Sequence, residues 1–178
     1  MKRLIRSVSI MLALVVIFTL SIIPAQASVT QTETTKELDA NNGTLIAYAA
    51  FDRFGSHMSN GMEWDYTGKA SIKNSPNSGT LKLTIKGQAS LRKSASISIG
   101  VGVDSVSASV SSSWEIVSST YSQTKSVTKK SAEQSTSDTS NLIVAPRADY
   151  NNNTACITVT ASIKYSNSSK TYKINALA

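Results

Sequence analysis

The chain has 178 residues and a formal net charge of +7, with 18 Lys and Arg residues against 11 Asp and Glu residues. With one cysteine and one histidine, it can form neither an intramolecular disulfide nor a structural zinc site. The basic residues are spread along the chain, in runs of at most two, and are not interleaved with aromatic residues, so we expect no nucleic-acid partner. The length suits one domain with its own hydrophobic core.

The N-terminal segment has the pattern of a secretory signal peptide. Three basic residues precede an apolar run over 10–23, and Ala25-Gln26-Ala27 is a small-residue cleavage site. The apolar run is shorter than the roughly 20 residues of a membrane-spanning helix, which makes a retained anchor the less favoured alternative. We therefore expect residues 1–27 to be removed and the mature protein to be secreted and extracellular.

The remaining chain divides into a polar lead and a β domain. Residues 28–42 are polar, rich in threonine and without apolar periodicity, so we expect a flexible polar segment. Residues 43–178 are expected to form an antiparallel β domain. Within it, residues 45–51 predict a mostly buried strand, and residues 62–66 predict a strand with Met, Trp and Tyr on one face.

A turn and a half-buried strand follow. The residues from Asn74 to Gly79 are types that favour turns. They lead into Leu81, Leu83 and Ile85, which alternate with Thr and Lys. This alternation predicts a strand with one buried face and one wet face.

Residues 94–117 show a sustained alternation of apolar side chains with serine and glycine. Because successive side chains of a strand point to opposite faces, this alternation predicts a central amphipathic β-hairpin. With Asp104-Ser105 as its loop, Val103 would lie opposite Val106, although Asp-Ser is not a favoured loop and a wider one is the alternative. The positions that would face a core or a membrane are Ile97, Ile99, Val101, Val103, Val106, Val110 and Trp114.

The C-terminal part combines a polar stretch with a second hairpin. Residues 118–140 are rich in Ser and Thr, so we expect an extension of the ribbon that loses its apolar face near residue 117, followed by a solvated loop. Residues 142–145 predict a short buried strand. The last hairpin would pair alternate apolar positions of 157–165 with those of 172–176. Cys156, at its start, is expected to be a partly buried thiol, with an intermolecular disulfide as the alternative.

These patterns predict an all-β fold. No segment longer than about ten residues has the 3.6-residue period of an amphipathic helix. Seven or eight strands at regular spacing favour an antiparallel β-sandwich or an elongated twisted sheet, as a single domain after removal of the signal peptide.

The sequence offers little for catalysis or metal binding. His57 has Asp52, Glu63 and Asp65 near it in the chain, but the serines come from strand alternation and no Gly-x-Ser-x-Gly turn is present. The segment 149–153 begins like a calcium loop, but threonines stand where such a loop needs Gly and Glu. We therefore expect no enzyme activity, no catalytic residue, no metal and no cofactor.

The first functional hypothesis is a non-enzymatic binding or interaction module outside the cell. Its partner would be an envelope polymer, a membrane surface or another protein. Exposed aromatic rings could stack on sugar or pack on a partner. The candidates are Trp64, Tyr66 and Tyr150, with core packing as the alternative for each.

The alternative hypothesis is pore formation by insertion of the hairpin 94–117. Each arm has the length of about 9–11 residues that a tilted strand needs to cross a bilayer, and its Ser/Gly face would meet water. Oligomers would be required, because an open strand edge in lipid leaves backbone groups unpaired. The layout resembles the Ser/Thr-rich insertion hairpins of aerolysin-like pore-forming toxins, and this resemblance implies an oligomeric pore.

Overall fold

The computed structural model describes residues 29–53, 55–57, 62–91, 96–101, 104–109, 115–145 and 155–178. Within these ranges the helical element is a single 3-10 turn, η1 (Asp39–Asn41), and the other elements are strands. The strands are β1 (Val29–Glu37), β2 (Thr44–Asp52), β3 (Ser56–His57), β4 (Met62–Lys73), β5 (Gly79–Leu91), β6 (Ser96–Val101), β7 (Asp104–Ser109), β8 (Glu115–Val127), β9 (Gln134–Ala145), β10 (Ala155–Tyr165) and β11 (Thr171–Leu177). The prediction of an all-β chain is confirmed.

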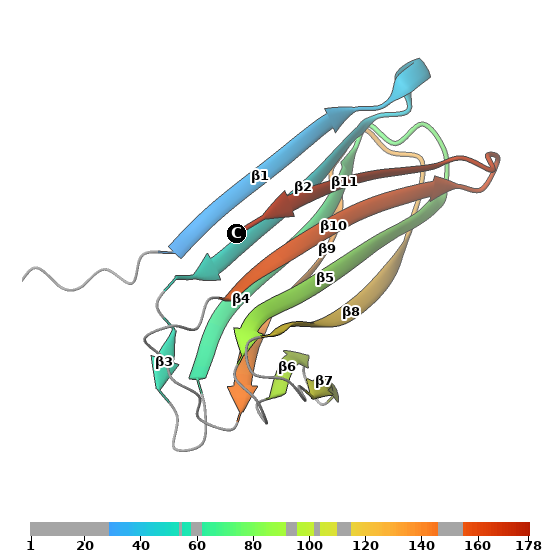
Figure 1. Cartoon of the computed structure of the whole chain (residues 1–178). Helices are drawn as coiled ribbons and strands as arrows, with labels where there is room; N and C mark the ends of the chain where they lie inside the picture. Colours follow the sequence, from blue (N-terminus) through green and yellow to red (C-terminus); the bar gives the residue numbers. More distant parts are fainter. Residues whose placement is uncertain are drawn as a thin grey trace, which may run out of the picture.

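The strands form two antiparallel sheets that pack on each other. The larger sheet has the order β1-β2-β4-β9-β6-β7, and β3 pairs with β4 beside this path. The smaller sheet has the order β11-β10-β5-β8. Every described pair of strands is antiparallel. The long strands curve together along the molecule, and the short strands β6 and β7 lie near one end of it (Figure 1).

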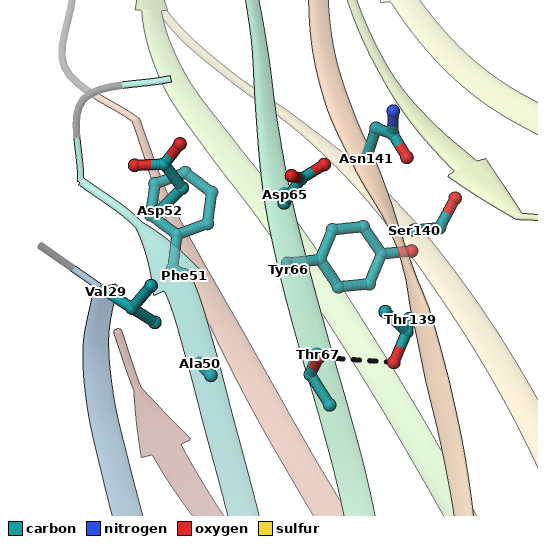
Figure 2. A pocket seen from close by; sticks show the side chains of 10 residues that line it. All are labelled: Val29, Ala50, Phe51, Asp52, Asp65, Tyr66, Thr67, Thr139, Ser140 and Asn141. Carbon is teal, nitrogen blue, oxygen red and sulfur yellow. Dashed lines mark hydrogen bonds between the residues drawn. The ribbon is translucent and has the colours of Figure 1, made fainter. Parts of the chain in front are cut away.

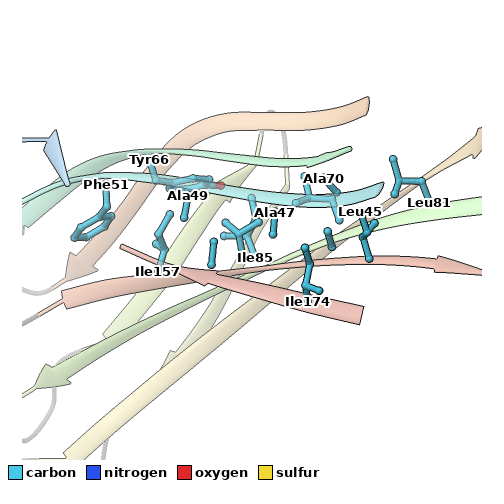
Figure 3. Close-up of a cluster of buried hydrophobic side chains, with 14 of the residues drawn as sticks. Leu45, Ala47, Ala49, Phe51, Tyr66, Ala70, Leu81, Ile85, Ile157 and Ile174 are labelled. Atoms are coloured by element: carbon cyan, nitrogen blue, oxygen red, sulfur yellow. The ribbon is translucent and has the colours of Figure 1, made fainter. Parts of the chain in front are cut away.

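The hydrophobic core lies between the two sheets and is built by alternate side chains of the long strands. Leu45, Ala47 and Ala49 of β2 point inward and are fully buried. Figure 3 shows that this row faces Ile85 of β5 and Ile157 of β10. Both isoleucines are fully buried. Burying side chains of this size is the main stabilising term of such a fold, at about 1.5–3 kcal/mol each.

Several predicted elements are confirmed. Leu81, Leu83 and Ile85 are buried on one face of β5, and residues 74–78 form the turn before this strand. The C-terminal hairpin also has the predicted pairing of apolar positions, with Ala161 opposite Ile174 and the neighbouring apolar pairs in the same register. In each case period-two alternation and turn chemistry agree, so local sequence was sufficient.

The prediction of a flexible segment over residues 28–42 is wrong for residues 29–37, which form β1. This strand pairs with β2 from Val29 opposite Asp52 to Glu37 opposite Thr44. Most of its side chains are exposed, so no apolar alternation marks it in the sequence. Backbone hydrogen bonds to a neighbouring strand hold such an edge strand, and Leu38, 5% exposed, anchors its end in the core.

The predicted extension of the ribbon beyond residue 117 is present as β8, but the solvated loop that follows it is shorter than predicted. Residues up to Val127 belong to β8, residues from Gln134 belong to β9, and only 128–133 connect them. Strand β8 pairs along β5, and β9 pairs along β4, so both strands have a partner that supplies their hydrogen bonds. Serine and threonine are accepted in strands whose faces are partly wet.

The central hairpin forms, but with a register different from the prediction. Val101 lies opposite Asp104, and Ile99 lies opposite Val106. Asp104 and Ser105 are therefore paired residues of β7 and not a loop. An Asp-Ser pair lacks the glycine that two-residue loops favour, which explains why another register is preferred. In this register Ile97 and Ile99 still lie opposite the apolar residues Ala108 and Val106, whereas Val101 lies opposite an acid.

The hairpin β6–β7 is part of a longer ribbon. Strand β5 pairs with β8 up to Leu91 opposite Glu115, and the chain between these two residues contains the pair β6–β7. The two parts nevertheless belong to different sheets, because β6 pairs with β9 from Ser96 opposite Ala145 to Ile99 opposite Leu142. The ribbon thus leaves the smaller sheet and ends in the larger one.

The helical content of the described ranges is confined to the short turn η1, and no helix there has the length and apolar character needed to cross a membrane.

Candidate functional site

The outer face of the larger sheet, which points away from the smaller sheet, carries the candidate site. On β4, Met62, Trp64 and Tyr66 point to the core, so the residues between them point outward. The neighbouring strands follow the same parity in register, because Thr67 lies opposite both Ala50 and Thr139. Two hollows lie on this outer face.

The first, which we call the Thr67 hollow, has a volume of about 430 Å³. Figure 2 shows Thr67 of β4 joined to Thr139 of β9, with Asp65 and Asn141 as the next pair along the same strands. The two threonine hydroxyls are 3.2 Å apart. The hollow offers hydroxyl, amide and carboxylate groups, and it is lined by Val29, Ala50, Phe51, Asp52, Asp65, Tyr66, Thr67, Thr139, Ser140 and Asn141.

The second, which we call the Tyr48 hollow, has a volume of about 260 Å³. It lies farther along the same strands, since Tyr48 lies opposite Lys69 whereas Ala50 lies opposite Thr67. Its lining combines one half-exposed aromatic ring with charged side chains of both signs. The lining residues are Glu33, Ile46, Tyr48, Lys69, Ser71, Lys73 and Glu133.

Glu133 is the electrostatic centre of the Tyr48 hollow. Its carboxylate lies 2.7 Å from Lys69 Nζ and 3.5 Å from Lys73 Nζ. The hydrogen bond from Lys69 is the main cause that lowers the pKa of Glu133 to about 2, and Ser71 and the charge of Lys73 act in the same direction. The carboxylate is therefore ionised across the whole physiological pH range.

Ser71 is a buried polar residue of the same hollow. Its side chain is fully buried, and its Oγ has no partner that meets hydrogen-bond geometry among the described residues. The hydroxyl still acts on the carboxylate of Glu133 as a weak hydrogen-bond donor, and it helps to lower the pKa of that group. An incompletely bonded hydroxyl at this depth is uncommon and requires an explanation.

Two of the aromatic residues predicted for surface binding are instead core residues. Trp64 is 4% exposed and stacks on Phe51 with ring centroids 6.4 Å apart. Tyr66 is 2% exposed, and its hydroxyl donates a 2.8 Å hydrogen bond to Asp138. Burial, followed by this contact with Asp138, raises the pKa of Tyr66 far above its usual value. Both rings lie on one face of β4, as the alternation predicts, but this face points to the core. The third candidate, Tyr150, lies outside the described residues.

The hairpin positions are described only in part. The backbone pairing of Ile97, Ile99, Val101 and Val106 is given by the register of β6 and β7. Val103, Val110 and Trp114 lie outside the described residues. Whether the apolar positions face a core or a membrane therefore stays a prediction.

The residues weighed for catalysis lie on the short strand β3, at the start of β4 and at the end of β2. His57 is exposed on β3, opposite Met62, and Ser56 lies opposite Glu63. Asp65 is exposed on the outer face, and Asp52 lies beside the Thr67 hollow. No cluster of three or more His, Cys, Asp or Glu side chains suited to a metal occurs in the part of the chain that the structure describes. The segment 149–153 lies outside that part.

Cys156 is half-buried on β10, opposite Gln88 of β5. Burial raises the pKa of its thiol, and the charge of Lys86 offsets this effect in part. At neutral pH the group is therefore a protonated, weakly nucleophilic thiol.

The residues that line the Tyr48 hollow were not predicted from the sequence. Tyr48 interrupts an otherwise apolar strand at a position of outward parity, and this signal was present in the sequence. Lys69 and Lys73 share the outward parity of β4. Glu133, by contrast, could be placed only once β4 and β9 were known to pair, because this pairing joins segments far apart in the chain.

Comparison with known proteins gives no family for this chain. No family model and no curated protein sequence matches it. Among solved structures, it is similar to the enzymatically active domain of tailspike protein 4 of bacteriophage CBA120, with 10% identity and a TM-score of 0.20. The match covers 71% of this chain but only 19% of the tailspike chain. A likeness this weak carries no argument about function.

Proposed function

We propose that this protein is a secreted, non-enzymatic binding protein that holds a polymer of a cell envelope or surface along the outer face of its larger sheet. The observation that supports the proposal is the alignment of the two hollows along β4. The stretch from Asp65 to Lys73 lines both and spans about 26 Å at the ordinary rise of a strand.

The chemistry of this face suits an extended polar ligand. It presents threonine hydroxyls in the first hollow and a tyrosine ring with paired charges in the second. Such groups can donate and accept hydrogen bonds at several points along a chain. A long, shallow strip of this kind favours a linear polymer over a small enclosed ligand, which normally occupies a deeper apolar pocket.

Co-sedimentation tests the proposal directly. The mature protein, at about 10 µM, is mixed with insoluble chitin, cellulose or bacterial cell-wall sacculi, and the bound fraction is measured against protein concentration. We expect saturable binding to at least one of these polymers. If none of the three retains the protein above the level of a non-binding control protein, the proposal is wrong.

Membrane insertion of the central hairpin is the second candidate function, and the ribbon formed by β5–β8 and β6–β7 favours it. Residues 92–95 connect β5 to β6, and residues 110–114 connect β7 to β8. The second connection is therefore one residue longer than the first. A single β-bulge would accommodate this extra residue if β6 and β7 left β9 and continued the β5–β8 pair as one extended ribbon. Only β6 among the hairpin strands pairs with β9 in the described register.

A further inference from the structure

We infer that the Tyr48 hollow is a subsite for one uncharged, hydroxyl-rich sugar ring. The inference rests on the proposed binding function and names the ligand class of one part of its surface. Three features of the hollow support it: the buried hydroxyl of Ser71, the balanced charges around Glu133, and the ring of Tyr48.

Ser71 supplies a hydroxyl whose hydrogen-bonding capacity is only partly used, by a weak contact with Glu133. Its Oγ lies in the wall of the hollow, is fully buried and has no hydrogen-bond partner of good geometry among the described residues. Leaving a buried polar group incompletely bonded destabilises the folded protein. A ligand hydroxyl that enters the hollow can donate to this oxygen or accept from it, and so recover that cost on binding.

The charges of the hollow favour a neutral ligand over an ion. Lys69 and Lys73 both face the carboxylate of Glu133, at 2.7 Å and 3.5 Å. An anionic ligand would have to compete with this carboxylate for the lysines, and a cation would meet both ammonium groups. A sugar hydroxyl can donate to Glu133 and accept from a lysine at once, without breaking the charge balance.

Tyr48 supplies a flat surface. Its side chain is half-buried, projects from β2 and lines the hollow together with Ile46. The C–H face of a pyranose ring packs against such an aromatic face while its hydroxyls point to the polar rim. The aromatic ring, the ion pairs and the buried hydroxyl thus surround one space of about 260 Å³.

The experiment uses chitotetraose and cellotetraose as soluble neutral probes, with the insoluble polymers as a second format. Binding to the mature protein is measured by calorimetry for wild type, Tyr48→Ala, Tyr48→Phe and Ser71→Ala. Tyr121→Ala, which removes a similarly half-buried tyrosine from the smaller sheet, is the matched control, and thermal unfolding of each variant verifies its fold.

We expect Tyr48→Ala to weaken binding about tenfold or more, and Tyr48→Phe and Tyr121→Ala to leave it within about twofold of wild type. Ser71→Ala should weaken binding about threefold to tenfold while the protein unfolds at the same or a higher temperature, because the variant loses an incompletely bonded buried group. A purely structural role for Ser71 would lower the unfolding temperature instead.

Other outcomes overturn the inference in distinguishable ways. If wild type binds a polymer and Tyr48→Ala binds it equally well, the subsite assignment is wrong while the binding function stands. If wild type binds only the cell-wall sacculi, and this binding decreases steeply between 50 mM and 500 mM NaCl, the ligand is an anionic polymer and the assignment to a neutral sugar is wrong. If wild type binds none of the soluble or insoluble probes, the binding function itself fails.

Discussion

At the scale of single residues, Glu133 connects the stability of the protein to pH. Its ordinary pKa of 4.5 is lowered to about 2 in the folded protein, mainly by the hydrogen bond from Lys69. A group whose pKa is lowered on folding stabilises the folded state above its unfolded pKa. This contribution is lost as the pH decreases from about 4.5 to about 2.

We therefore expect Glu133→Gln to destabilise the protein at pH 7 by about 1 kcal/mol, a modest value because water partly screens the ion pairs. The difference from wild type should shrink between pH 4.5 and pH 2 and vanish at the lower end. Urea unfolding at several pH values measures it. Glu33→Gln, in the same hollow, is the control, and an unchanged difference at pH 2 would contradict this origin of the effect.

Residue chemistry alone could not separate core aromatics from surface aromatics. Trp64 and Tyr66 were correctly placed on one face of a strand, but the direction of that face depends on which sheet covers it. Tyr48, by contrast, lies at an outward position and is partly exposed, although most other residues of its strand are buried. The sequence alone shows which side chains of a strand share a face, whereas the packing of the whole molecule determines which of the two faces is buried.

At the scale of elements, Gly68 determines how closely β4 approaches the smaller sheet. A Cβ atom at this position would lie 2.6 Å from Ile85 Cδ1 and 3.2 Å from Val159 Cγ2. Both neighbours belong to the smaller sheet, in β5 and β10, and both are fully buried. The glycine is thus required by the distance between the sheets.

We expect Gly68→Ala to destabilise the protein by about 1–3 kcal/mol, because an extra methyl group overpacks the core. Removing the Cδ1 methyl group by Ile85→Val should relieve part of the clash. In urea unfolding, the loss for the double variant should therefore be smaller than the summed losses of the single variants. Strictly additive losses would show that Ile85 is not the group that clashes.

The elements that sequence analysis predicted correctly are those with a clear apolar alternation. Strands β5, β10 and β11 carry it, and so do the inward positions of β2 and β4. Strand β1 and the greater part of β8 and β9 lack it. Strand β1 pairs with β2, the next strand along the chain, whereas β8 and β9 pair with β5 and β4 farther away. Pairing with another strand leaves no mark on a polar segment, so β1 and the polar part of β9 could not be predicted from their own residues.

At the scale of the whole molecule, the hairpin β6–β7 holds the only predicted membrane-inserting segment, and its attachment to β9 can be controlled. Ser98 lies opposite Ile143 across β6 and β9. Paired residues of antiparallel strands have Cα atoms about 4.5–5.5 Å apart, within the range of a disulfide. A cross-link here would hold the hairpin on the larger sheet.

We expect the variant Ser98→Cys/Ile143→Cys, with Cys156→Ser to remove the native thiol, to release dye from anionic vesicles only after reduction. The control, Ser96→Cys/Ser109→Cys on the same background, cross-links β6 to β7 and leaves the hairpin free to leave β9, so it should release dye in both redox states. If wild type at about 10 µM releases no dye, hairpin insertion is wrong.

The position of β10 has a consequence for how the chain reaches this fold. It comes late in the sequence, yet it lies between β11 and β5 in the interior of the smaller sheet. A ribosome therefore delivers this interior strand after its neighbour β5 and after β8, and the sheet can close only after synthesis is almost complete. Pairings over such sequence distances form slowly, so we expect the nascent polypeptide to stay unfolded during most of its synthesis. An unfolded chain is also the form that a translocation channel can transport.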